Sequence, residues 1–312
     1  NRILRPTAMT NVQVWYEGSS LWLNNNKLPL SSQRISEFLA NLGQKNIPEE
    51  FMRRFAAQIE PNATLLYDIT SLSSSSKLLE SLEYGYNRDN DGLPQINFSL
   101  VVDKEKGIPV RYDIYPGSIA DITTLKNTII RLKDAGSEQF RLVMDRGFFS
   151  QTTLAELLSE NIPFILPATY QLTSIKELMS KSQNKVKQAE YLQKLEKGPI
   201  FAMPVKLEHQ LDIEDKPRPI TVDGYCYYDP KREQDERDSF YVQLFDASDR
   251  LKKARPQSWK RPEVVVNEIA KGFARYLKWK FTDGTFEVSI RQKAVTQRIN
   301  RLGRFILFYN GE

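Results

Sequence analysis

Apolar residues recur at helical spacing in the first sixty positions. They predict one helix between Ser31, whose hydroxyl can cap it, and Gly43, which can end it. A second helix is predicted from Pro48, a residue favoured in a first helical turn, to Ile59. Residues 1–60 therefore predict a small helical N-terminal subdomain.

The next stretch, residues 61–168, alternates between short β-rich runs and amphipathic segments. Strands are predicted at Thr64–Thr70, Ile96–Asp103, Val110–Tyr115, Phe140–Met144 and Pro163–Pro167, and helices at Asp121–Ala135 and Ser150–Glu160. Three successive strands indicate an antiparallel meander, and each later helix is a crossover that adds a parallel strand. The order β-β-β-α-β-α-β predicts an α/β fold with the mixed sheet of the ribonuclease-H-like type.

Residues 169–312 depart from that order. Helices are predicted over 170–198, 231–253 and 263–280, and strands over 200–211, 220–228, Phe286–Ile290 and Arg304–Tyr309. This region is too long and too regular for a loop, so we interpret it as an α+β insertion domain. The chain starts at Asn1 and stops just after an apolar run, and we expect it to be a fragment.

The scarcest residues narrow the chemistry. The sequence holds one cysteine, Cys226, and one histidine, His209, which lies in an alternating run and is interpreted as a surface strand residue. An intrachain disulfide is excluded, as is typical of a reducing cytoplasm, and Cys/His zinc clusters and Ser-His-Asp arrangements are disfavoured. No apolar run reaches the roughly 18–20 residues of a membrane span. Any catalysis must therefore rest on carboxylates, with or without a hard metal ion.

Charge is unevenly distributed, although the net charge of the chain is only +5. Residues 251–304 carry fourteen Lys and Arg against four acids, with Trp259, Tyr276 and Trp279 interleaved. This segment could follow a phosphate backbone or could be a solvated helix face, and charge alone leaves both interpretations open.

Two aspartates follow or interrupt apolar strands. Asp68 lies within Leu65–Ile69, and Asp145 closes the strand that ends at Met144. A buried carboxylate is costly unless it is paired, hydrogen-bonded or metal-bound. Taken singly, each fits a strand-end or cap residue. Taken together they favour function, because the first and fourth strands should be parallel neighbours and bring both acids to one edge of the sheet as an oxygen site for Mg²⁺ or Mn²⁺.

Neighbouring residues have simpler explanations. Asp121 fits a helix N-cap better than a ligand, Arg146 could bind phosphate or pair with an acid, and Thr70 should share a strand face with Asp68. Three further aromatic residues are interpreted as core rather than as a base-stacking platform: Tyr225, Tyr227 and Tyr228.

Five short motifs occur in order along residues 60–312. They are Tyr67-Asp68-Ile69-Thr70-Ser71, Gly92-Leu93-Pro94-Gln95-Ile96, Pro116-Gly117-Ser118-Ile119-Ala120-Asp121, Met144-Asp145-Arg146-Gly147-Phe148 and Tyr227-Tyr228-Asp229-Pro230. In these motifs the chain resembles the DDE transposases of bacterial and archaeal insertion sequences, in the group with a β-rich insertion within a ribonuclease-H-like domain.

The resemblance implies that Asp68 and Asp145 are catalytic metal ligands, the first two of an acidic triad. It implies Mg²⁺ or Mn²⁺ as cofactor, two ions with a complete triad, and cleavage and strand transfer on double-stranded DNA at terminal inverted repeats and a target. It further implies a homodimer in a synaptic complex and a cytoplasmic, nucleoid-associated location. The third acid, a Glu on a helix after the insertion, has no counterpart here, and Glu312 is a poor substitute. We therefore expect the chain to stop before that helix and to be inactive alone.

Two other functions stay open from the sequence. One is a non-catalytic or domesticated DNA-binding protein that keeps the fold, and the other is a ribonuclease-H-like nuclease that only hydrolyses. The presence of both Asp68 and Asp145 argues against decay, and the large insertion of residues 169–312 favours transposition within the resembled family.

Overall fold

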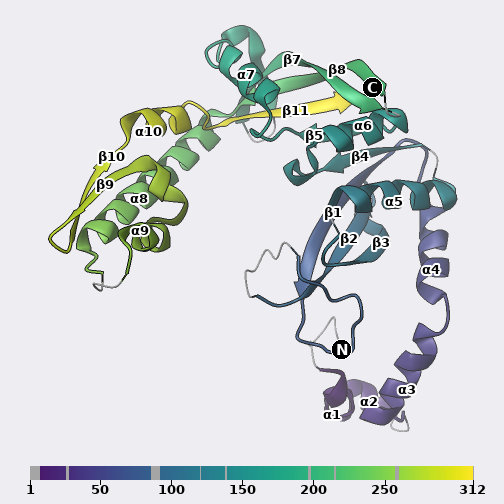
Figure 1. Ribbon diagram of the computed structural model, residues 1–312. Coiled ribbons are helices and arrows are strands. Elements are labelled where there is room, and N and C mark those ends of the chain that lie inside the picture. The colour runs from purple at the N-terminus through teal and green to yellow at the C-terminus, as the bar shows by residue number, and fades with distance from the viewer. Residues whose placement is uncertain are drawn as a thin grey trace.

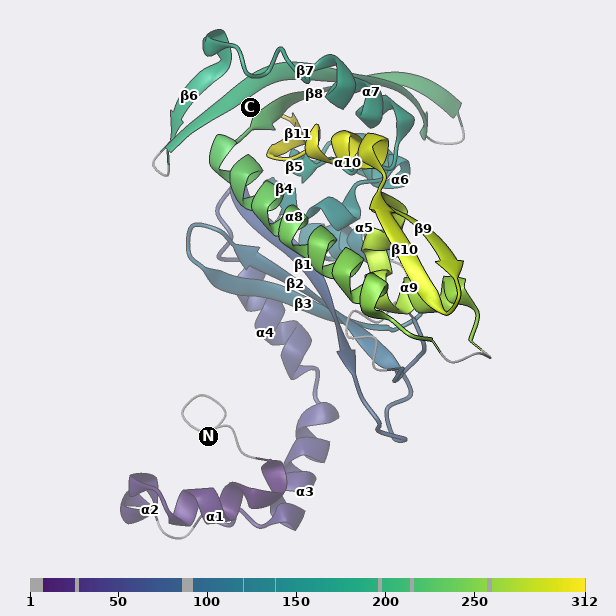
Figure 2. The same ribbon diagram turned by 90° about the vertical axis from the view of Figure 1, so that its left-hand side faces the viewer.

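The protein is a mixed α/β structure built on one large sheet (Figure 1). The computed structural model describes residues 8–25, 28–85, 92–119, 121–137, 139–195, 198–213, 216–256 and 260–311. A helical N-terminal segment extends from one end of the sheet, and a separate lobe projects to one side of the sheet (Figures 1 and 2). Within the described part, no helix is both long and apolar enough to span a bilayer.

The N-terminal segment holds the two predicted helices and some shorter ones. The described elements are η1 (Met9–Asn11), α1 (Val12–Glu17), α2 (Ser20–Asn24), α3 (Ser32–Gly43) and α4 (Ile47–Ala56). The Ser31 hydroxyl accepts a hydrogen bond from the Arg34 backbone N–H, so the predicted cap of α3 is confirmed. Helices α1 and α2 were not predicted because five or six residues are too few to show a helical period.

The sheet contains nine strands among the described residues, in the order β3-β2-β1-β4-β5-β11-β8-β7-β6. Its first five strands are β1 (Ala63–Ser73), β2 (Gln95–Asp103), β3 (Ile108–Pro116), β4 (Phe140–Met144) and β5 (Phe164–Pro167). Strands β1, β2 and β3 pair antiparallel, whereas β4 pairs parallel with β1, and β5 pairs parallel with β4. The predicted mixed sheet is confirmed.

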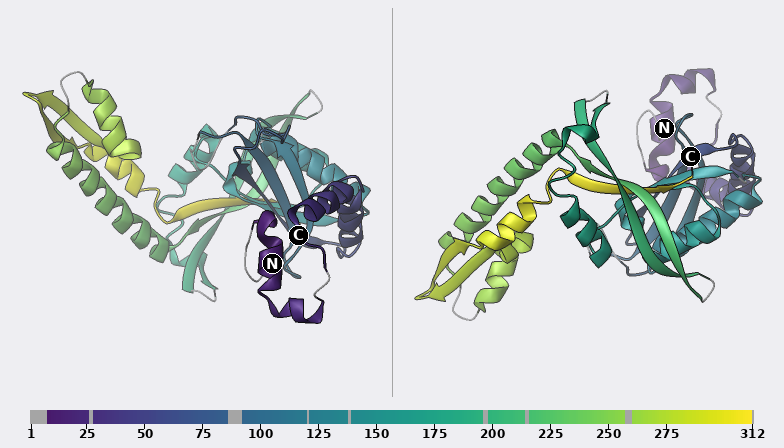
Figure 3. Two further views of the ribbon diagram at one scale, coloured as in Figure 1. Left: turned by 90° about the horizontal axis from the view of Figure 1, so that it is seen from below. Right: turned by 90° about the horizontal axis from the view of Figure 1, so that it is seen from above.

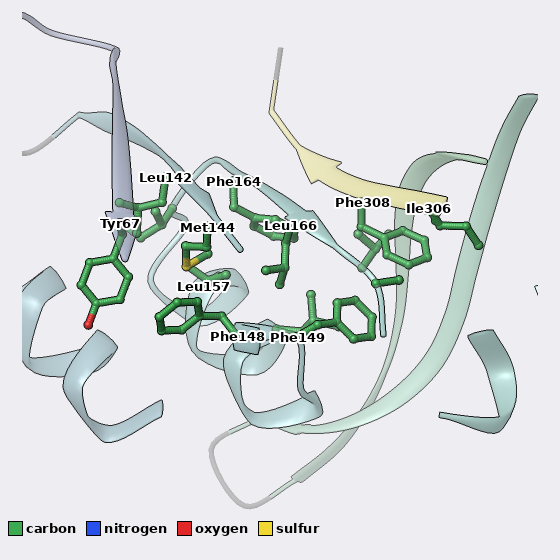
Figure 4. Packing of buried hydrophobic residues seen from close by; sticks show 14 of the residues in the cluster. Tyr67, Leu142, Met144, Phe148, Phe149, Leu157, Phe164, Leu166, Ile306 and Phe308 are labelled. Carbon is green, nitrogen blue, oxygen red and sulfur yellow. The ribbon is translucent and has the colours of Figure 1, made fainter. Parts of the chain in front are cut away.

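Two crossover helices, α5 (Asp121–Asp134) and α6 (Gln151–Ser159), cover one side of these strands. The lobe stands on the opposite side (Figures 1 and 3). The main core lies beneath the helices, where Tyr67, Met144, Phe164 and Phe308 project from four different strands toward α6 (Figure 4). One face of β1 and β4 is thus buried, and the other is not covered by α5 or α6.

The sheet continues through strands that come later in the chain: β6 (Leu192–Leu195), β7 (Gly198–Ile213), β8 (Lys216–Tyr228) and β11 (Arg304–Asn310). Strand β11 pairs antiparallel with both β5 and β8, which joins these strands to the first five. The predicted boundary between residues 168 and 169 stays a prediction, as does the one between 60 and 61.

The single helix predicted over 170–198 is wrong. That region contains α7 (Thr173–Lys181), a 3-10 turn η3 (Ala189–Tyr191) and strand β6. The cause is tertiary, because β6 pairs with the start of β7, with Leu192 opposite Phe201. The segment Leu192–Leu195 takes strand geometry because the neighbouring strand supplies hydrogen-bond partners.

The lobe contains α8 (Pro230–Lys253), α9 (Pro262–Ala270), η4 (Lys271–Tyr276), β9 (Leu277–Thr282), β10 (Thr285–Ile290) and α10 (Gln292–Ile299). It has its own hydrophobic cluster, which includes Phe240, Leu251 and Phe286. The helix predicted over 263–280 is wrong beyond Ala270, because Lys271 takes a positive φ of 46° and residues 277–282 pair with β10. Helix α10 was not predicted.

Candidate active site

Asp68 lies on the side of β1 that faces away from the core. Leu65, Tyr67 and Ile69 are buried, whereas Asp68 and Thr70 are exposed. The expectation that Asp68 occupies a costly buried position is therefore wrong, since the two-residue period of the strand turns it outward. The prediction that Thr70 shares its face is confirmed. Asp68 also lies in mid-strand rather than at the sheet's edge, because β1 continues to Ser73.

Asp145 reaches the same face from the neighbouring strand. Tyr67 and Met144 are the last paired residues of the parallel strands β1 and β4, so Asp68 and Asp145 come next on each strand. The backbone of Asp145 stays extended, with φ −80° and ψ 169°, and its side chain is exposed. Adjacent strands are about 4.8 Å apart. The register therefore brings the two carboxylates together on the open face.

A short turn fixes Asp145. It is the N-cap of η2 (Arg146–Phe148), and its Oδ1 accepts a hydrogen bond from the Gly147 backbone N–H. A Cβ atom at position 147 would lie 2.9 Å from Asp145 Oδ1, so a larger residue there would displace the carboxylate. The predicted cap role of Asp145 is confirmed, and it leaves the second carboxylate oxygen for another partner.

Aromatic contacts hold the turn and β1 in place from the core side. The rings of Phe148 and Tyr67 are 5.1 Å apart, and those of Phe149 and Phe308 stack at 5.7 Å (Figure 4). Tyr67 Oη lies 3.0 Å from the Thr124 hydroxyl of α5, and burial raises the pKa of the Tyr67 phenol. Tyr67 directly precedes Asp68, and Phe148 ends the short turn that Asp145 caps. This packing therefore restrains the backbone that carries both carboxylates.

The two carboxylates have no ion-pair partner among the described residues. Within the described residues neither Asp68 nor Asp145 forms an ion pair, and Asp68 Oδ1 accepts only the Ile69 backbone N–H, at 2.8 Å. Arg146 is exposed and makes no ion pair in the same part of the chain. Two adjacent, unneutralised carboxylates form the hard-oxygen donor set that Mg²⁺ or Mn²⁺ prefers, so the residues fit such an ion. No cluster of three or more His, Cys, Asp or Glu side chains suited to a metal occurs among the described residues.

The three tyrosines of β8 divide between its faces. Tyr228 is buried, as predicted, whereas Tyr225 and Tyr227 are half-buried on the other face and stack on Tyr309 and Phe305 of β11. Several other sequence predictions lie outside the described residues. They concern the side chains of Asp121, His209, Trp259 and Glu312.

Sequence reasoning missed a buried charged cluster on the covered face of the sheet. Asp113 of β3 is bound by two hydrogen bonds from Arg111, of 2.9 and 3.0 Å, and by Arg131 of α5. Glu49 of α4 lies 3.4 Å from the same Arg111. Burial opposes the charge on Arg111, but Asp113 and Glu49 outweigh it and raise the Arg111 pKa. The available signal was the two-residue spacing of Arg111 and Asp113, which places both on one strand face.

The order of strands and helices is that of a ribonuclease-H-like α/β domain, and Asp68 and Asp145 follow the last paired residues of its strands β1 and β4. Residues 64–261, more than half of the chain, match the family model described as "Transposase DDE domain". The chain belongs to this family, and the resemblance to DDE transposases is confirmed. A comparison with curated proteins gave no match.

Solved structures similar to the chain include a cryo-EM structure of the piggyBac transposase synaptic complex with hairpin DNA. It is 14% identical, with a TM-score of 0.31, over 49% of this chain and 32% of that one. The Drosophila P element transposase strand transfer complex is 13% identical, with a TM-score of 0.29, over 64% and 48%. A Ciona intestinalis Endonuclease V complex with a 24mer DNA is 12% identical, with a TM-score of 0.25, over 61% and 77%. The chain thus spans about a third of the piggyBac chain it matches.

Proposed function

We propose that this chain is the catalytic part of a metal-dependent DNA transposase that cleaves and joins phosphodiesters at the ends of a mobile element. The observation that supports this most is the in-register placement of Asp68 and Asp145 on parallel neighbouring strands, within a chain of the transposase DDE domain family. The substrate class is double-stranded DNA, and a second copy of the chain would complete a synaptic complex.

The proposed roles follow from the residues. Asp68 and Asp145 would hold Mg²⁺, with two ions expected once a third acid is supplied. When bound, such ions activate an attacking oxygen and stabilise the leaving oxygen in phosphoryl transfer. Thr70, exposed on the same face two residues along β1, would orient water or an outer ligand. Arg146, exposed beside Asp145, would contact a phosphate oxygen of the substrate.

Metal binding by the chain itself tests the proposal. Titration with Mn²⁺, followed by electron paramagnetic resonance of the free ion, should show weak binding that Asp68→Asn or Asp145→Asn each reduces by tenfold or more. Asp223→Asn is the matched control, because Asp223 is also an exposed strand aspartate but lies 3.4 Å from the Lys206 ammonium. Equal binding by all four proteins would overturn the assignment.

The products separate transposition from its two alternatives. With a DNA duplex carrying the element's end and a target plasmid, a transposase gives joined products that depend on Asp68 and Asp145. Cleaved but never joined DNA would indicate a nuclease instead. Unchanged DNA from a protein in which a third acidic residue is supplied, together with retained DNA binding, would indicate a non-catalytic DNA-binding protein.

A further inference from the structure

Helix α10 lies where the lobe meets the sheet (Figures 1 and 2). Two adjacent hollows flank it. The first, of about 170 Å³, lies between α10 and α7, and the second, of about 210 Å³, lies between α10 and η4. Gln297 and Arg301 line both. The two hollows therefore adjoin each other at these residues, and we call them together the α10 groove.

Cations line both hollows of the α10 groove. Neither hollow has an Asp or Glu in its wall, and the cations that line them are Lys176, Arg275, Arg298, Arg301 and Arg304. In the part of the chain that the structure describes, none of these five forms an ion pair. Uncompensated cations in a groove attract an anionic ligand.

Helix α8 of the same lobe shows the opposite arrangement. Arg232 pairs with Glu236 at 2.9 Å, Arg250 with Asp246 at 3.4 Å, and Lys252 with Asp249 at 3.3 Å. These cations serve their own helix as pairs three or four residues apart. Within the described residues other lobe cations, such as Arg291 and Lys293, are also without an ion pair, so the α10 groove is distinguished by the convergence of its cations on two hollows.

The contacts inside the groove hold its cations in place. Arg304 is buried, and its Nη1 donates to the Met179 carbonyl oxygen at 2.7 Å. Burial lowers the pKa of Arg304. The Arg301 guanidinium lies 5.7 Å from the Tyr170 ring centre, and that of Arg275 lies 4.9 Å from the Tyr276 ring centre. Aromatic support of this kind orients a guanidinium while leaving its N–H donors free.

The spacing matches a repeating anion better than a single one. Lys176 lines the first hollow, Arg298 lines the second and Arg301 lines both, so the exposed cations are spread over the two hollows. Gln297 and Asn300 add neutral hydrogen-bond donors between them. Guanidinium groups bind phosphate oxygens in a bidentate manner, and the four exposed cations, Lys176, Arg275, Arg298 and Arg301, can engage successive phosphates. The buried Arg304 donates instead to the Met179 and Asn300 carbonyl oxygens and supports the wall of the groove.

We propose that the α10 groove binds the sugar–phosphate backbone of duplex DNA, and this inference rests on the proposed function. Within the basic segment 251–304, we assign contacts with DNA to the residues of the groove only. The paired cations of α8 are not expected to contact DNA, whereas Lys176 of α7, outside that segment, is. Contacts to the sugar–phosphate backbone position a duplex and contribute affinity without sequence preference.

The test compares two triple variants of equal charge. Binding of a fluorescently labelled 20-base-pair duplex would be followed by anisotropy over a range of KCl concentrations. Lys176→Gln/Arg298→Gln/Arg301→Gln should flatten the log–log salt slope by up to about 2.7, at roughly 0.9 for each lost phosphate contact. The matched control Arg232→Gln/Arg250→Gln/Lys252→Gln should leave that slope unchanged. All six residues lie on the surface of helices or turns, and circular dichroism would check that both variants fold.

A lysine variant sharpens the result. Arg298→Lys/Arg301→Lys keeps the charge and should retain the wild-type salt slope. Equal slopes for the two triple variants would overturn the α10 groove while leaving DNA binding, and so the proposed function, intact. A wild-type chain that binds no duplex would overturn both. Loss of Mn²⁺ binding in Asp68→Asn with an unchanged salt slope would support both, because the two sites are separate.

Discussion

Aspartates on the two faces of the central sheet differ in burial and in ion pairing. On the covered face, the side chain of Asp113 is 3% exposed and bound to Arg111 and Arg131. On the open face, Asp68 and Asp145 are exposed, adjacent and unpaired within the described residues. The same residue type therefore serves structure on one face and is free to bind a ligand on the other.

The difference shows what to look for in a carboxylate site. The charge of Asp113 is neutralised by arginines of the protein itself. The cluster around it connects α4, β3 and α5 through Glu49, Arg111, Asp113 and Arg131. Two acids held together without a cation repel each other, and a divalent ion relieves that repulsion. The lack of an ion pair at Asp68 and Asp145, within the described part, is thus the feature that favours a metal there.

The largest expected effect comes from breaking the buried cluster. Asp113→Ala leaves the Arg111 guanidinium buried without its main partner, and we expect it to lower the free energy of unfolding by about 3–5 kcal/mol. Asp68→Asn should change that free energy by less than about 0.5 kcal/mol, because it alters an exposed side chain. Urea denaturation of both variants measures this contrast. Similar losses in the two would show that the faces do not differ as described.

Metal ions should stabilise through the open face only. At Mn²⁺ concentrations about one hundred times the dissociation constant, the free energy of unfolding of the wild-type chain should rise by about 2.7 kcal/mol. The increase should vanish in Asp145→Asn and persist in Asp223→Asn. Thermal unfolding with and without Mn²⁺ gives the result, and an equal increase in Asp145→Asn would place the bound metal elsewhere.

A smaller effect separates the members of the buried cluster. Glu49 is 51% exposed and lies 3.4 Å from Arg111, so water already screens their attraction. Glu49→Gln should therefore cost less than about 1 kcal/mol of unfolding free energy. A loss as large as that of Asp113→Ala would mean that Glu49, and not Asp113, neutralises the buried guanidinium.

The smallest effect concerns an exposed acid that does have cations. Hydrogen bonds from Arg53 and Arg54 lower the pKa of Glu50 from 4.5 to about 2. Because the pKa in the folded state is the lower one, the stabilisation is complete above pH 4.5 and is lost as pH falls toward 2. The difference in unfolding free energy between the wild type and Glu50→Gln should shrink over that range. NMR titration of the Glu50 carboxyl group with a midpoint near 4.5 would contradict this prediction.

Much of the sheet could be predicted because its signals are local. The alternation around Asp68 and the crossover helices before β4 and β5 are visible in short windows, and they sufficed to place Asp68 beside Asp145. Strands β6 and β9 could not be placed as readily, since each depends on pairing with a strand that follows it. Even so, residues 277–282 alternate between Leu, Trp or Phe and polar residues, which was a usable strand signal.

The site was predicted in its members but not in its environment. Sequence order predicts which strands are neighbours, so it could bring two acids together, but it could not tell that they are exposed. Nor could it separate the free cations around α10 from the paired ones of α8, because pairing depends on which helix face each acid occupies. In the sequence, Arg111 and Asp113 cannot be distinguished from a surface pair, because their burial depends on α4 and α5.

The central claim is that Asp68 and Asp145 jointly hold a divalent cation on the open face of the sheet. Anomalous diffraction from crystals of the chain grown with Mn²⁺ tests it most directly. The account predicts a peak within about 2.0–2.6 Å of a carboxylate oxygen of each aspartate, the range for hard cations bound to oxygen. Carboxylates more than about 8 Å apart, or a Mn²⁺ peak that contacts neither of them, would contradict it.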